Sequence, residues 1–404
     1  MKFFRNIIIN PLLEFIQDSR AIGITLLCCT VLSLIVSNIS GWGESYQQIW
    51  LHHFDGTNNH HTNLFFLSLP NSILLIINDF LMAIFFFLAG MEIKRELLEG
   101  ELSSFKKSIL PITAAIGGMI MPALFYLFFN HNNIFKNGWA IPTATDIAFT
   151  LGIASLLGKR VPISLKIFLT ALAIIDDLGA IVVIAIFYGG AIKLFFLIAC
   201  VVIAIILLLL NKFKVKNILL QVILALALWY CMFNSGIHAT VAGVVFALFI
   251  PAQQLKQLEH KFYFPVYFLI VPLFALANSS IQFADNSFDN IIHSSLSWGI
   301  TAGLCLGKPL GIFLISFLMI KLKWAAIPNE TNILQLLGAG MLAGIGFTMS
   351  IFIATLAFKT QAEQDVAKTA VLIASLISMI IGFVWLRAFS PQSRRERQVL
   401  QNNY

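Results

Sequence analysis

Residues 162–187 read PISLKIFLTALAIIDDLGAIVVIAIF, an apolar stretch with two adjacent acids, Asp176 and Asp177, near its centre. About 20 apolar residues of helix are enough to cross the hydrocarbon core of a bilayer. This stretch is therefore predicted to span a membrane and to hold two carboxylates near the midplane. Carboxylates at that depth are costly, and they usually mark an ion or proton pathway.

Apolar runs of similar length cover most of the 404-residue chain. Hydrophobic residues make up 59% of it and charged residues 11%, and the mean hydropathy is +0.88, whereas soluble proteins are about 25% charged. This composition excludes a soluble cytoplasmic enzyme. We expect an all-α polytopic membrane protein, a single transporter domain over 1–404, with twelve transmembrane helices near 21–39, 72–91, 109–130, 141–157, 162–187, 192–210, 217–232, 235–250, 262–278, 297–320, 332–357 and 367–388.

The basic residues predict the orientation of these helices. With the amino terminus inside, twenty of the 26 Lys and Arg fall in the inner segments and four in the outer segments and span ends. Because short cytoplasmic loops carry the excess of Lys and Arg, we expect both termini in the cytoplasm. The positive net charge then reflects membrane orientation and not a nucleic-acid partner. The amphipathic stretch 3–17 is expected to lie at the inner surface of the membrane.

The long outer loop 40–70 is a candidate dimerisation hairpin. Its four histidines are weak candidates for metal ligands, and solvated side chains are the preferred interpretation: His52, His53, His60 and His61.

Five ionisable residues lie near the middle of apolar runs: Asp79, Asp146, Asp176, Asp177 and Lys308. Each costs about 2.5–3.5 kcal/mol at the centre of a membrane helix. Buried ion pairs that only fix helix packing are one interpretation, but four acids cannot all pair with one base. An ion or proton pathway accounts for the set better.

Asp176 and Asp177 are about 100° apart around a helix, so they face one cavity from different angles. Two carboxylates so close repel each other when both are ionised. The pair can therefore hold a small hard cation or protons, each at the expense of the other, and competition for one site is sufficient for exchange. Lys308 could pair with one carboxylate when no cation is bound.

Two runs, 141–157 and 332–357, are expected to be broken helices that cross near mid-membrane. The first begins with Ile-Pro-Thr-Ala-Thr before Asp146, and the second contains Gly344 and Gly346. Helix breaks at this depth are tolerated where the freed backbone lines a cavity or faces protein. Asp146 would compensate the positive amino ends of the half-helices, and Lys308 the negative carboxyl ends.

Short matching strings indicate an inverted repeat with units of about 109–187 and 297–388. IAFT at 147–150 resembles IGFT at 345–348, and ITA at 112–114 recurs at 300–302. The segments that carry these strings enter the membrane from opposite sides in the predicted topology, as inverted repeats do.

Six motifs closely resemble the NhaA family of bacterial sodium/proton antiporters: AIIDDLGA at 173–180, ATDIAF at 144–149, GKPLG at 307–311, GIGFTMS at 344–350, SGIHAT at 235–240 and MEIKRE at 91–96. The resemblance runs in order from about residue 70 to 390. It implies electrogenic exchange of cytoplasmic Na+ or Li+ for a larger number of external H+ by alternating access, in the bacterial inner membrane and without a cofactor.

The resemblance also implies roles for the charged residues. Asp177 would be the main cation ligand, and Asp176 the proton carrier that pairs with Lys308. Asp146 and Thr145 match the broken-helix positions beside the site.

Members of the family are activated at alkaline pH by a cluster at the cytoplasmic mouth. Here this cluster would include Glu92, Glu96, Glu259 and His260. Two positions depart from the family prototype: Tyr263 stands where a further histidine is expected, and Gln257 where a basic residue is expected.

Three other classes of membrane protein could use intramembrane acids. An intramembrane aspartyl protease could use Asp146 and Asp177, but neither lies in Gly-x-Gly-Asp, and proteolysis would not need Lys308. A passive channel would use rings of like groups from several subunits. A sodium-coupled symporter of related architecture is the alternative that the sequence leaves open.

Overall fold

The computed structural model describes residues 19–56, 60–64, 67–213, 217–283 and 291–390. The chain divides into two compact units, each assembled from separate segments. The first comprises 1–27, 104–177 and 286–404, and the second comprises 28–103 and 178–285. The amphipathic stretch at 3–17 lies outside the described residues.

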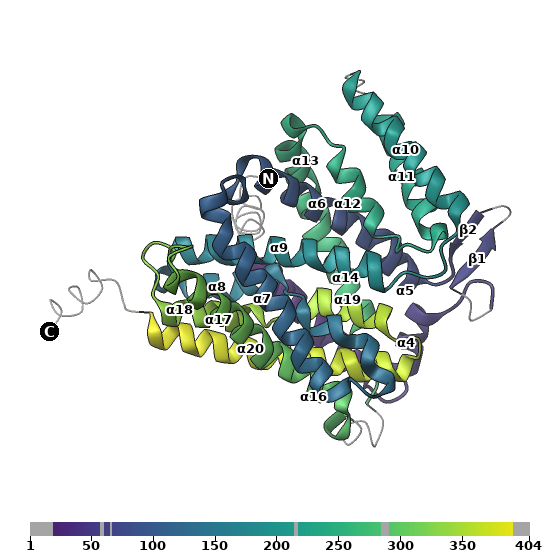
Figure 1. The fold of residues 1–404 in the computed structure, drawn as a ribbon. Helices are drawn as coiled ribbons and strands as arrows, with labels where there is room; N and C mark the ends of the chain where they lie inside the picture. The colour runs from purple at the N-terminus through teal and green to yellow at the C-terminus, as the bar shows by residue number, and fades with distance from the viewer. Residues whose placement is uncertain (1–18, 57–59, 65–66, 214–216, 284–290, 391–404) are drawn as a thin grey trace, which may run out of the picture. The chain divides into compact units, whose positions relative to one another are not determined.

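The described part of the chain is a multi-span helical membrane protein, as predicted (Figure 1). Nine of its helices are long and apolar enough to cross a membrane, and two bent helix pairs raise the number to eleven. The remaining expected run, 235–250, corresponds to α12, Val241–Leu248, which is shorter than the roughly 20 residues of a span. The preceding helix stops at Gly236, whose φ of +91° favours glycine because it lacks a Cβ.

The first unit contains both bent pairs. Its elements are α7 Phe105–Asn130, a 3₁₀ helix Ile134–Thr143, α8 Ile147–Leu156, a 3₁₀ turn Gly158–Arg160, most of α9 Ile163–Phe187, α16 Ser295–Ala302, a π-helical turn Gly303–Gly307, α17 Lys308–Lys321, α18 Ile333–Ala343, α19 Phe347–Ala357 and α20 Gln361–Phe389.

Close helix packing in this unit depends on small residues. Gly117 of α7 and Gly311 of α17 lie against each other, and a Cβ on either would come within 2.4 Å of the other's carbonyl oxygen. Small residues allow this approach in membrane helices, where van der Waals contact replaces the hydrophobic effect. The packing of α7 against α17 positions Lys308, the first residue of α17.

The second unit begins within α3 Ser19–Ser37. Its other elements are α4 Gly43–Leu51, strands β1 His61–Leu64 and β2 Leu67–Pro70, α5 Ile73–Leu75, a π-helical turn Ile76–Leu81, α6 Met82–Glu99, a 3₁₀ turn Glu101–Ser103, the end of α9, α10 Leu194–Lys212, α11 Ile218–Ser235, α12, α13 Ala252–Pro265, a π-helical turn Val266–Ile270 and α14 Val271–Asn278.

The outer loop 40–70 folds into α4 and an antiparallel hairpin of β1 and β2. His61 lies opposite Pro70 in the register. The hydroxyl of Tyr230 on α11 accepts a hydrogen bond from the Ser68 amide at 3.4 Å, and Figure 1 shows the hairpin beside the ends of α10 and α11. The hairpin is thus held by the second unit and is not a free loop.

Candidate functional site

The two bent helix pairs of the first unit meet at their breaks. The 3₁₀ helix Ile134–Thr143 and α8 are bent by 44°, and α18 and α19 by 45°. The amide of Asp146 donates to the carbonyl of Ile345 at 2.7 Å, which joins one break to the other. The first pair begins at Ile134, earlier than the predicted start at 141, because a 3₁₀ helix extends it.

Asp146 lies at the amino ends of two half-helices. It caps α8, where one oxygen accepts a hydrogen bond from the Phe149 amide at 3.1 Å. Its other oxygen accepts from both the amide of Thr348, at 3.1 Å, and the hydroxyl of Thr348, at 2.6 Å, at the start of α19. A carboxylate in this position interacts favourably with the positive ends of both helix dipoles.

Lys308 pairs with Asp176 inside the first unit. Its Nζ lies 2.5 Å from Oδ2 of Asp176, and both side chains are 0% exposed. The same ammonium donates to the carbonyl of Thr143, the last residue of the 3₁₀ helix. Lys308 therefore stabilises a carboxylate and the negative end of a half-helix together.

Thr145 joins the same network from within the first break. Its hydroxyl lies 2.6 Å from Oδ2 of Asp176 and 2.9 Å from the carbonyl of Ala343, the last residue of α18. Thr150 donates in the same way to the carbonyl of Leu342 at 3.0 Å. Polar side chains thus satisfy the backbone groups that the two breaks leave without helical partners.

Asp177 is buried beside Asp176, at 5% exposure, and interacts electrostatically with Lys308. Oδ1 of Asp176 has no hydrogen-bond donor among the described residues. The site therefore combines two adjacent carboxylates with one ammonium, away from lipid and solvent. Carboxylate oxygens are the ligands that small hard cations prefer, so a cation and the ammonium would compete for the same negative charge.

The acids of the predicted cytoplasmic cluster lie in the second unit around Arg95, which the sequence did not single out as a member of the cluster. Arg95 on α6 contacts Glu259 on α13 at 2.9 Å and its neighbour Glu96 at 2.8 Å. Glu92 interacts electrostatically with all three. His260 is exposed, and it makes no hydrogen bond or ion pair with any residue that the structure describes.

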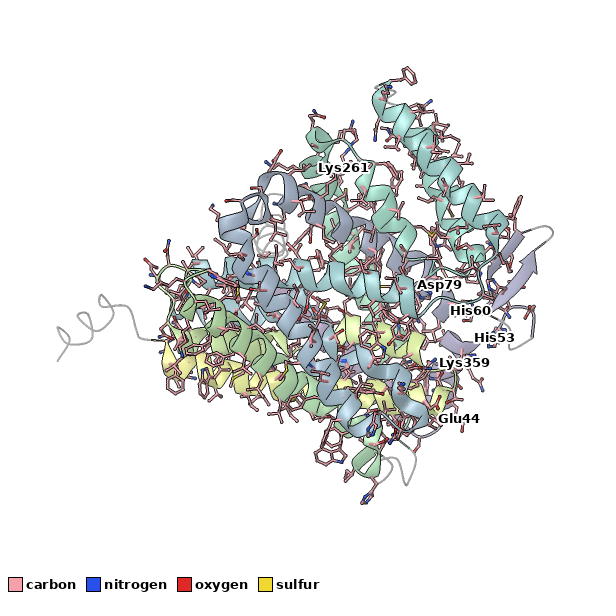
Figure 2. The ribbon with its side chains drawn as sticks, in the orientation of Figure 1. Glu44, His53, His60, Asp79, Lys261 and Lys359 are labelled. Carbon is pink, nitrogen blue, oxygen red and sulfur yellow. The ribbon has the colours of Figure 1, made fainter. Side chains whose placement is uncertain are left out.

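Asp79, the remaining acid of the predicted set, lies in the second unit, in the π-helical turn before α6. Nε2 of His60, just before β1, lies 3.6 Å from Oδ2 of Asp79. Both residues are labelled in Figure 2. The His60 side chain is 50% exposed, and the partial burial of its ring and, to a smaller extent, the neighbouring His61 lower its pKa to about 4. The imidazole is therefore neutral at pH 7. One of the four outer-loop histidines thus contacts a buried acid and is not simply solvated.

The structure adds residues that sequence reasoning missed. One of them is Thr348, whose amide and hydroxyl donate to Asp146. Its position inside the glycine-rich motif at 344–350 could have indicated a role at the helix break. Lys368, assigned from sequence to the outer segments and span ends, is buried in α20 beside Asp365. A lysine close to a span end cannot be placed from hydropathy alone, because its depth depends on the packing of the helix.

A multi-span helical fold with two facing broken helices and a buried acid–base network defines an ion-coupled membrane transporter. Comparison with known proteins gives the same class. The family described as "Na+/H+ antiporter 1" matches residues 13–386. The chain belongs to this NhaA family of sodium/proton antiporters.

Three relatives show how much of the chain the similarity covers. The chain is 46% identical to "Na(+)/H(+) antiporter NhaA 2" of Flavobacterium johnsoniae, over 95% of this chain and 94% of that protein. It is 45% identical to "Na(+)/H(+) antiporter NhaA 1" of Clostridium beijerinckii, over 94% of this chain and 95% of that protein. It is 44% identical to "Na(+)/H(+) antiporter NhaA" of Salmonella arizonae, over 93% of this chain and 97% of that protein.

Proposed function

We propose that this protein is an electrogenic antiporter that exchanges cytoplasmic Na+ or Li+ for external H+ by alternating access. The observation that carries the proposal is the buried contact between Lys308 and Asp176, next to Asp177. A lysine that already neutralises one carboxylate gives the site a defined cation-free state. A cation entering the site must displace that ammonium.

The exchange follows from competition for the two carboxylates. Na+ binds to Asp177 and Asp176, and Lys308 leaves Asp176. After the site opens to the outside, the cation departs and protons bind to the two carboxylates. The site then opens to the cytoplasm again, and the pair of Lys308 and Asp176 forms once the protons are released there. The exchange is electrogenic because two carboxylates and one lysine allow more than one proton to return for each cation.

The broken helices supply the fixed frame for this exchange. Asp146 and Thr348 hold the amino ends of α8 and α19, while Lys308 and Thr145 bond to carbonyls at the carboxyl ends of the other two halves. When Lys308 separates from Asp176, its ammonium can still donate to the carbonyl of Thr143. The ammonium therefore keeps a hydrogen-bond acceptor inside the membrane after it leaves Asp176.

The architecture supports a pair of inverted repeats, at about 109–187 and 297–388. Each contains a long helix, a bent pair and a further long helix: α7 to α9 in one, and α16 with α17 to α20 in the other. The two bends have nearly equal angles, 44° and 45°. Two such units of opposite direction are a common basis for alternating access.

We place the protein in the bacterial inner membrane, in contact with lipid, with both termini cytoplasmic. The distribution of Lys and Arg supports this orientation. The hairpin of β1 and β2 supports a homodimer. A two-stranded sheet has two unpaired edges and is marginally stable by itself, so pairing with a second copy would satisfy one edge.

We assign the alkaline activation to the cluster of Glu92, Arg95, Glu96 and Glu259. Ion pairs between α6 and α13 depend on the charges of these acids, so a change in their protonation alters the contact between the two helices. His260, being exposed, would act as a weaker modulator than the acids.

Proton release on addition of Na+ to the purified protein in weakly buffered detergent solution tests the exchange. An antiporter acidifies the medium, and the Asp177→Asn variant should not. A sodium-coupled symporter would take up protons or leave the pH unchanged, and that outcome would replace the antiport proposal.

A further inference from the structure

The amino end of α19 lies at the second helix break and has no cap of its own. Its N-cap position is Gly346, which has no side chain that could accept a hydrogen bond. A Cβ on Gly346 would collide with the hydroxyl of Ser350, so a capping side chain does not fit there. The first amides of this half-helix are buried in the membrane and therefore need acceptors from other parts of the first unit.

Ser375 on α20 supplies one of these acceptors. Its hydroxyl oxygen accepts hydrogen bonds from the amides of Gly346 and Phe347, at 3.3 Å and 3.2 Å. Asp146 accepts a hydrogen bond from the next amide, that of Thr348. Two side chains, a neutral hydroxyl and a carboxylate, thus satisfy three consecutive amides at the start of α19. Ser375 is 4% exposed, so bulk solvent does not reach this contact.

The other half-helices with a side-chain cap do not depend on a separate helix for it. Asp146 caps α8 from the position directly before that helix, and Asn332 caps α18 in the same way. The hydroxyl that caps α19 comes from a residue 29 positions further along the chain. The start of α19 is therefore set by its packing against α20.

The same part of α20 contacts the π-helical turn directly before Lys308. The thiol of Cys305 in that turn donates to the carbonyl of Ala374 at 3.4 Å, and the hydroxyl of Ser378 donates to the Cys305 sulfur at 3.5 Å. Ser375 lies between these two α20 residues in the sequence. Within little more than one helical turn, α20 therefore contacts both the start of α19 and the segment that leads to Lys308.

The proposed inverted repeat gives Ser375 a counterpart in the ion site. IAFT at 147–150 and IGFT at 345–348 are 198 residues apart, and the same offset relates Asp177 to Ser375. Each of these two residues lies on the long helix that follows a bent pair. The second repeat thus has a hydroxyl where the first has an acid. A hydroxyl can satisfy backbone amides without placing a second negative charge beside Asp146.

We propose that Ser375 is a positioning residue of the ion site, which fixes the start of α19 and thereby the place of Asp146 and of the carboxylates that bind the cation. This inference rests on the proposed transport function. Thr348 of α19 bonds to Asp146, and the adjacent Thr145 bonds to Asp176 at 2.6 Å. Without the Ser375 hydroxyl, two amides at the start of α19 lose their acceptor, so this end of the helix shifts and the chain of contacts to Asp176 shifts with it.

Thermal stabilisation of the full chain by Na+ in detergent at alkaline pH tests the inference, because it reports cation binding whether or not protons are exchanged. Ser375→Ala should raise the Na+ concentration for half-maximal stabilisation about tenfold, which equals about 1.4 kcal/mol and is the size of one hydrogen bond. Ser375→Thr keeps the hydroxyl and should restore the affinity for Na+.

Thr369→Val is the matched control on α20. The Thr369 hydroxyl is buried like that of Ser375, but it bonds within its own helix, to the carbonyl of Asp365 at 2.7 Å. Its loss should lower the melting temperature without Na+ and leave the Na+ midpoint unchanged. The midpoint therefore separates a positioning role from a general contribution to packing.

Should Ser375→Ala fail to fold, Ser375→Cys takes its place, because a thiol keeps the side chain's shape and accepts hydrogen bonds only weakly. A Na+ midpoint equal to that of Thr369→Val, or a Ser375→Thr variant that does not recover, would overturn the inference.

Failure of the proposed function is recognised separately. An unmodified chain that binds Na+ without releasing protons would contradict antiport, and the comparison of Ser375→Ala with Thr369→Val would still decide the role of Ser375. An unmodified chain that Na+ does not stabilise at all would overturn both.

Discussion

Nζ of Lys308 lies 2.5 Å from Oδ2 of Asp176, a residue 132 positions earlier in the chain, and neither side chain is exposed. Removing one partner of a buried ion pair leaves the other charge uncompensated, at a cost of about 3–5 kcal/mol. This contact joins α9 to α17 and places a positive charge directly on the proposed proton carrier. The contact therefore stabilises the packing of these two helices and lies in the proposed transport site.

Lys308→Ala should lower the thermal stability of the protein and also lower its apparent affinity for Na+ at a given pH. Without the ammonium, Asp176 retains protons more readily, so protons compete better with Na+. Unfolding in detergent and Na+ dependence at two alkaline pH values measure the two effects. Lys308→Arg keeps the charge and should retain part of both properties. If Lys308→Ala matches the unmodified chain in both, Lys308 does not stabilise Asp176.

Asp177→Asn should abolish exchange. An amide cannot supply the anionic ligand that a dehydrated Na+ requires. The measurement is the Na+-driven pH change in inverted membrane vesicles, and Asp146→Asn, which weakens only the contacts to two helix ends, should lose less. Near-normal rates for Asp177→Asn would exclude Asp177 as the cation ligand.

Thr348→Val should reduce stability and transport, because its hydroxyl donates to Asp146 at 2.6 Å. The amide of Thr348 still donates to the same oxygen, but the loss of one hydrogen bond to a charged group costs about 1.5–3 kcal/mol. Thr348→Ser should restore the bond. Thr355→Val is the matched control on α19, since that hydroxyl bonds only within its own helix, to the carbonyl of Phe352. Equal melting temperatures for Thr348→Val and Thr355→Val would contradict the role of Thr348.

Glu259→Gln and Glu92→Gln should shift the pH profile of transport while leaving the maximal rate nearly unchanged. Both remove a charge from the group around Arg95. Glu99→Gln is the control, because Glu99 and its partner Lys256 are largely exposed, and exposed pairs contribute little. His260→Ala should shift the profile less than either acid. A larger shift for His260→Ala than for Glu259→Gln would return the histidine to the centre of the sensor.

Replacement of residues 62–69 by two glycines should convert dimers to monomers in detergent, as measured by light scattering. The change removes the strand edges available for pairing but keeps His60 and its contact with Asp79. His60→Gln serves as the control and should remain dimeric. A shortened protein that stays dimeric would place the dimer interface elsewhere.

The helices and the adjacent aspartates of the proposed ion site could be predicted from local sequence. Apolar runs of span length occur wherever a helix must face lipid, because hydrocarbon offers no partner for polar groups. Asp176 and Asp177 stand out for the same reason, since an acid in such a run is costly. The breaks were visible as well, through Pro142 and through Gly344 and Gly346.

The contacts between distant segments were decided only by the tertiary structure. Composition could not show that Arg95 is the centre of the acidic cluster, that His60 reaches Asp79, or that Lys368 is buried. Hydropathy records the average environment of a segment, whereas a contact depends on rotation, depth and bending of two helices together. The sequence by itself indicated that four acids and a lysine lie in membrane-spanning runs, because such charges stand out against apolar neighbours, and the family resemblance implied the pair of Lys308 and Asp176. Only packing, which sets the rotation and depth of two broken helices together, assigned Thr348 to Asp146.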